Sequence, residues 1–137
     1  MEVNRAREVG CGMRLLLAGL LILSLGGWLR LALAISNQAW LEQFGVAPGV
    51  AYIAVTGGLV GAAAALAFWA LAAGYRWAPA ATRIIVTVLA LGYWADRLLF
   101  TQSSAAWANW PFMLVLTLVC LGCTFLVLWR SDRKSVV

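Results

Sequence analysis

Four apolar blocks, each long enough to cross a lipid bilayer as a helix, constrain this chain more than any other feature. They cover residues of about 13–35, 48–74, 80–100 and 111–129. A helical span needs roughly 20 predominantly apolar residues. A proline stands at or near the start of each of the last three blocks, at Pro48, Pro79 and Pro111. The sequence therefore predicts an all-α integral membrane fold, a four-transmembrane-helix bundle in which residues 1–137 form one domain.

The composition agrees with a membrane environment. Apolar residues make up 64% of the chain and charged residues 11%, whereas a soluble domain carries about 25% charged residues. In a soluble protein, the net charge of +5 would suggest nucleic-acid binding, but here the basic residues lie at the ends of apolar blocks. They form no basic face with interleaved aromatic residues. We therefore expect the lipid bilayer as a partner and no nucleic acid.

The basic residues also predict an orientation in the membrane. The connections 36–47 and 102–110 contain no lysine or arginine, whereas eight basic residues flank the other ends of the blocks. They are Arg5, Arg7, Arg14, Arg76, Arg83, Arg130, Arg133 and Lys134. By the positive-inside rule, both termini are cytoplasmic and the chain is a multi-pass protein of the inner (cytoplasmic) membrane of a bacterium. The alternative for the first block is a signal peptide cleaved after Ala34. The length of the block and the charge of Arg30 favour a retained span.

The second block predicts close helix packing through two rows of small residues. One row contains Gly57, Gly61 and Ala65, and the row beside it contains Ala54, Gly58 and Ala62. Small residues four apart let helix backbones approach closely, either within the bundle or against another subunit. The stretch GGLVGA within these rows resembles a glycine motif of small bacterial fluoride channels, which also have four spans. In that family the motif lies near the amino terminus and leads into an arginine, whereas here it lies in the second span without one.

Four charged residues lie inside or close to the spans and form the main candidate site. At about 1.5 Å per residue, Asp96 lies roughly 20 Å and Arg30 roughly 24 Å from the cytoplasmic surface. We therefore predict an intramembrane ion pair between Arg30 and Asp96 that joins the first and third spans, and a second contact between Arg97 and Glu42 of the outer connection. Isolated ionisable residues are costly within a bilayer, so the cluster is either a structural or subunit contact or a ligand or ion site.

Residues that would support catalysis are scarce. The CLGC stretch at Cys120 and Cys123 resembles the motif of four-helix, quinone-coupled thiol oxidases related to vitamin K epoxide reductase. Here it lies near the membrane midplane, and neither outer connection supplies a second cysteine pair, which favours a packing role. Histidine is absent, and the first span lacks the glutamate on which small multidrug transporters rely. We expect no enzymatic activity, no metal and no cofactor.

These observations leave two main functions open. We expect a non-catalytic small integral-membrane subunit that packs against other integral-membrane subunits and stabilises a larger complex, such as a respiratory or photosynthetic electron-transfer assembly. The alternative is a small stand-alone carrier or binding protein for a lipophilic or ionic ligand, which would use the Arg30, Asp96 and Arg97 cluster together with Tyr93 and Trp94.

Overall fold

The computed structural model describes residues 10–44, 49–100 and 108–134, with side chains up to residue 130. The helices within these ranges are α1 (Cys11–Ser36), α2 (Gln38–Gln43), α3 (Val50–Ala72), α4 (Ala78–Phe100) and α6 (Trp110–Lys134). Four of them are long and apolar enough to cross a membrane, and no strand occurs in the described ranges. The prediction of an all-helical, multi-pass chain with four spans is confirmed. The helix start expected at Pro48 and the side chains of Arg5, Arg7, Arg133 and Lys134 lie outside this description.

The helix bounds differ from the predicted spans by a few residues, for local reasons. Helix α4 begins at Ala78, so Pro79 lies in its first turn, where a missing backbone N–H costs little. Helix α6 continues to Lys134, because no glycine or proline follows Trp129 to end it. The connection after the first span forms the short helix α2, and the rings of Trp40 and Phe44 are in contact there, with centroids 4.7 Å apart.

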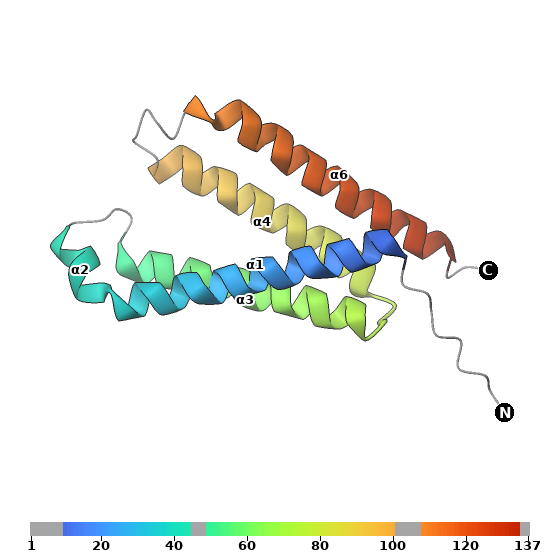
Figure 1. The fold of residues 1–137 in the computed structure, drawn as a ribbon, viewed down its shortest axis with the longest axis horizontal. Coiled ribbons are helices and arrows are strands. Elements are labelled where there is room, and N and C mark those ends of the chain that lie inside the picture. Colours follow the sequence, from blue (N-terminus) through green and yellow to red (C-terminus); the bar gives the residue numbers. More distant parts are fainter. Residues whose placement is uncertain (1–9, 45–48, 101–107, 135–137) are drawn as a thin grey trace.

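The four long helices form two antiparallel pairs, α1 with α3 and α4 with α6 (Figure 1). The pairs come together at the end of the molecule where α1 begins and α6 ends, and they separate toward α2 (Figure 1). We call these the closed end and the open end. Most of the buried side chains lie in the closed half: Leu20, Ser24, Ala64, Ala67, Ala70, Ala78, Thr82, Thr124 and Leu128.

The α1–α3 pair is held by a seam of glycines. A Cβ placed on Gly27 would lie 2.4 Å from the backbone nitrogen of Gly61 and 2.8 Å from the carbonyl oxygen of Gly57, so the two backbones are in direct contact. The buried hydroxyl of Ser24 donates a hydrogen bond of 3.0 Å to the carbonyl oxygen of Gly61. Close backbone approach of this kind is how helices associate in lipid, which gives little hydrophobic drive.

A tight turn at the closed end connects the two pairs. Gly74 has a φ of 73°, a left-handed conformation that ends α3 and that glycine adopts without a steric penalty. The turn carries aromatic residues. The rings of Tyr75 and Trp77 stack with centroids 5.6 Å apart, and the ring centroids of Trp69 and Tyr75 are 5.2 Å apart. The short connection between Ala72 and Ala78, together with these ring contacts, keeps the start of α4 beside the end of α3.

Candidate functional site

Polar side chains meet between the two helix pairs at the open end. The hydroxyl of Tyr52, in the first turn of α3, donates a hydrogen bond to a carboxylate oxygen of Asp96 on α4. The ring of Tyr52 also packs against Phe100, with centroids 5.2 Å apart. Asp96 and Phe100 are one helical turn apart, so they lie on the same face of α4. Tyr52 therefore connects α3 to α4 at the open end. At this end the two helix pairs have separated (Figure 1).

Arg30 of α1 joins this group from the same pair as Tyr52. A Cβ on Gly57 would lie 3.2 Å from the Cβ of Arg30, so the absence of a side chain at Gly57 lets Arg30 stand close to α3. Gly57 lies five residues after Tyr52 on α3, so Arg30 stands against the same stretch of that helix as Tyr52. Arg30 is exposed, whereas Tyr52 and Asp96 are half-buried. We call Arg30, Tyr52 and Asp96 the open-end polar cluster, to which three helices each contribute one residue.

The structure thus places the predicted partners Arg30 and Asp96 against the same stretch of α3. The direct partner of Asp96 is the Tyr52 hydroxyl, while Arg30 stands against Gly57. A direct ion pair between Arg30 and Asp96 stays a prediction. A tyrosine hydroxyl is a neutral donor, so this hydrogen bond does not supply an opposite charge to the Asp96 side chain.

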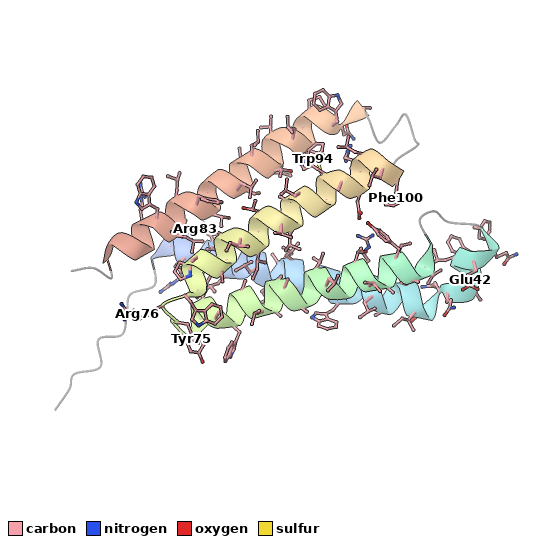
Figure 2. The ribbon with its side chains drawn as sticks, turned by 180° about the vertical axis from the view of Figure 1, so that it is seen from behind. Glu42, Tyr75, Arg76, Arg83, Trp94 and Phe100 are labelled. Atoms are coloured by element: carbon pink, nitrogen blue, oxygen red, sulfur yellow. The ribbon has the colours of Figure 1, made fainter. Side chains whose placement is uncertain are left out.

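Arg97 and Glu42 each have a partner within their own helix. The guanidinium of Arg97 donates a hydrogen bond of 2.9 Å to the hydroxyl of Tyr93, and its Cζ lies 5.9 Å from the Trp94 ring centroid. The carboxylate of Glu42 accepts a hydrogen bond of 2.8 Å from Gln38 in α2. Glu42 and the end of α4 at Phe100 lie at the same end of the molecule, on different pairs (Figure 2). The predicted Arg97–Glu42 contact stays a prediction.

The predicted rows of small residues lie in different surroundings. Gly57 and Gly61 are buried against α1, and a Cβ on Gly58 would meet only Leu31, at 3.5 Å. The three alanines of the rows are less covered: Ala54 and Ala65 are half-buried and Ala62 is exposed. Internal packing therefore accounts for the two glycines that contact α1. A docking role for the alanines stays a prediction.

The packing role predicted for Cys120 and Cys123 is not seen within the bundle, because both side chains are exposed. Cys11, Cys120 and Cys123 are exposed and form no disulfide. The carbonyl oxygen of Cys120 accepts a hydrogen bond of 2.8 Å from the Thr124 hydroxyl, which adds no charge near either thiol. Among the residues that the structure describes, no group of three or more histidine, cysteine, aspartate or glutamate side chains could hold a metal.

Three residues of structural importance were not singled out from the sequence. Tyr52 could have been found as a hydroxyl-bearing residue at the open-end start of its span, at the depth expected for Asp96. Gly27 could have been found because small residues recur at helical spacing on α1, at Ser24, Gly27 and Ala34, and the structure buries all three. Thr82 is fully buried with no hydrogen-bond partner for its hydroxyl among the described residues, and no sequence pattern indicates this.

Comparisons with models of protein families, with curated proteins and with solved structures find no match to this chain.

Proposed function

We propose that this protein is a non-catalytic integral-membrane subunit whose α4–α6 pair packs against transmembrane helices of a larger complex. The observation that carries this proposal is the uneven burial of the four spans. In the most apolar part of each span, 22% of the α3 residues are buried, against 11% in both α4 and α6. The α4–α6 pair is thus the less covered half of a small bundle.

Glycines on the uncovered faces support the same function. A Cβ on Gly92 of α4 or on Gly122 of α6 would meet no atom within 4 Å beyond its own helix, in contrast to the α1–α3 seam. Gly19 and Gly26 of α1 are open in the same way. A glycine on a span weakens the helix and adds no packing of its own, but it permits another helix to approach closely. An integral-membrane partner helix would use this space. A respiratory or photosynthetic electron-transfer assembly in a bacterial inner membrane is the kind of complex that we propose.

Substitution of Gly122, combined with purification in a mild detergent, tests the proposal. We expect the unmodified chain to co-migrate with a defined set of integral-membrane proteins and the Gly122→Leu variant to lose them, because the larger side chain blocks close approach. Leu118→Met is the matched control, since Leu118 is 59% exposed on the same helix and the change keeps an apolar side chain. A chain that purifies alone from native membranes, or a Gly122→Leu variant that keeps every partner, would contradict the subunit function.

A second candidate function, that of a small carrier or ligand-binding protein, is favoured by the open-end polar cluster. Intramembrane ionisable residues are costly and mark ligand or ion sites in many membrane proteins. Here Arg30 and Asp96, of opposite formal charge, come from different helix pairs and lie against the same stretch of α3, at Gly57 and Tyr52. The test is whether the purified chain retains a ligand that the double variant Arg30→Gln/Asp96→Asn does not retain. Equal ligand content in both proteins would contradict this candidate.

A further inference from the structure

We propose that the open-end polar cluster binds a zwitterion that carries a primary ammonium group and a phosphate, as in the headgroup of phosphatidylethanolamine. Asp96 and Tyr52 would hold the ammonium group, and Arg30 would hold the phosphate. This inference rests on the second candidate function and names the chemical class of its ligand.

The first argument is unused hydrogen-bonding capacity. A carboxylate has about four acceptor positions, and the Tyr52 hydroxyl occupies one of them on Asp96. Within the described part of the chain, no hydrogen bond or ion pair ends on the Arg30 guanidinium, which has five N–H donors. A primary ammonium group has three donors and no acceptor, which suits Asp96. A phosphate has only acceptors, which suits a guanidinium.

The second argument is the arrangement of charge. Arg30 and Asp96 have side chains of opposite formal charge, and both lie against the same stretch of α3. Asp96 meets Tyr52, and Arg30 meets Gly57, five residues further along. A purely anionic ligand would be repelled by Asp96, and a purely cationic ligand would be repelled by Arg30. A zwitterion offers a positive group to Asp96 and a negative group to Arg30, and it adds no net charge to the cluster.

The third argument is depth, which favours a lipid over a dissolved molecule. Asp96 lies four residues, or about 6 Å, before the end of α4, and Arg30 lies six residues, or about 9 Å, before the end of α1. A long arginine side chain extends from that depth toward the headgroup region. Leu33 and Leu99, one turn or less from the charged residues, are 52% and 73% exposed and offer apolar surface to acyl chains.

Lipid retention by the full chain tests the inference. The protein is reconstituted into bilayers of mixed phosphatidylethanolamine, phosphatidylcholine and phosphatidylglycerol, extracted in mild detergent, and its bound lipids are measured by native mass spectrometry. Phosphatidylcholine has the same phosphate but a methylated ammonium without N–H donors, and phosphatidylglycerol has no ammonium. We expect phosphatidylethanolamine to be enriched about tenfold over the other two, the effect of one hydrogen bond to a charged group.

The variants test separately the part of the site that would hold the ammonium group and the part that would hold the phosphate. Asp96→Asn should bring the enrichment of phosphatidylethanolamine over phosphatidylcholine close to one, whereas Asp96→Glu should keep it. Arg30→Gln should lower the retention of both lipids. Arg14→Gln is the matched control, because Arg14 is an exposed arginine of the same helix at the closed end. Circular dichroism and thermal unfolding establish that each variant is folded. If Asp96→Asn does not fold, Asp96→Glu still tests whether a carboxylate at this position supports the enrichment.

Each outcome bears on the inference. Enrichment that disappears in Asp96→Asn supports it. Displacement of that lipid by free phosphoethanolamine would identify the dissolved zwitterion as the source, whereas persistence of the lipid would identify the headgroup. Equal retention of all three lipids with dependence on Arg30 overturns the zwitterion but leaves a ligand-binding function. Equal retention of all three lipids with no effect of Arg30→Gln overturns both the zwitterion and the ligand-binding function.

Discussion

The two helix pairs show two ways in which apolar helices associate. In the α1–α3 pair, glycines bring the backbones into direct contact, and a serine hydroxyl crosses the interface. In the α4–α6 pair, the described glycines Gly92 and Gly122 contact no neighbouring helix. The buried side chains of this pair, all toward the closed end, are Ala78, Thr82, Thr124 and Leu128. All four helices are apolar enough to span a membrane. Apolarity therefore explains why they enter lipid, and side-chain size explains which of them pack closely.

The largest effect is expected in the glycine seam. A Gly27→Ala variant would place a Cβ 2.4 Å from the nitrogen and 2.7 Å from the Cα of Gly61, and neither atom can move without shifting α3. We expect a loss of about 3 kcal/mol in the free energy of unfolding, the upper part of the range for overpacked sites. Unfolding in mixed micelles of increasing denaturing-detergent content, followed by circular dichroism, measures it.

The neighbouring glycine is the control for this prediction. A Cβ on Gly26 would meet no atom within 4 Å beyond its own helix. Gly26→Ala should therefore be neutral or stabilise the protein by up to about 1 kcal/mol, because alanine is the better helix former. If the two variants unfold alike, the seam is not the tighter interface, and the contrast between the pairs disappears.

The second prediction concerns where α6 is attached. Leu128 has no exposed surface, whereas Leu126 on the same helix is 57% exposed. Leu128→Ala should cost about 1–2 kcal/mol, less than the roughly 2–5 kcal/mol known for cores of soluble proteins. The reason is that a leucine released into lipid stays in an apolar medium, so mainly its packing is lost. Leu126→Ala should change the same unfolding curve little. Equal losses would show that α6 is held along its whole length.

The sequence predicted the spans well and their arrangement only in part. Block length and the prolines at 79 and 111 identified the helices, because these features act locally along the chain. Gly57 and Gly61 were predicted to pack closely, but nothing in a span that is apolar on every side identifies its partner at Gly27. Asp96 was assigned to Arg30 by depth and formal charge, and the structure places Tyr52 against it. Depth follows from residue number, whereas helix rotation depends on tertiary contacts, and rotation is what brings Tyr52 to the carboxylate.

The third prediction separates polar from steric contributions within the seam. Ser24→Ala removes the hydrogen bond to the Gly61 carbonyl oxygen and leaves the glycine contact intact. We expect a loss of about 0.6 kcal/mol, the average for hydrogen bonds between transmembrane helices. Ser36→Ala is the matched control, since Ser36 is exposed at the end of α1. A loss as large as that of Gly27→Ala would mean that the hydrogen bond, and not backbone proximity, holds the pair together.

The smallest effect has the opposite sign and tests how well the two pairs fit where they meet. Thr82 of α4 is fully buried, and its hydroxyl has no hydrogen-bond partner among the described residues. In a separated helix, that hydroxyl would bond to the carbonyl four residues earlier, as Thr124 does to Cys120. Packing the pairs together therefore costs Thr82 a hydrogen bond that Thr124 keeps. Thr82→Val, which has nearly the same shape, should stabilise the protein by less than about 0.5 kcal/mol. Thr124→Val should be neutral or slightly destabilising in the same unfolding measurement. A destabilised Thr82→Val variant would mean that the hydroxyl gains a partner in the membrane and that the closed end is as well matched as the glycine seam.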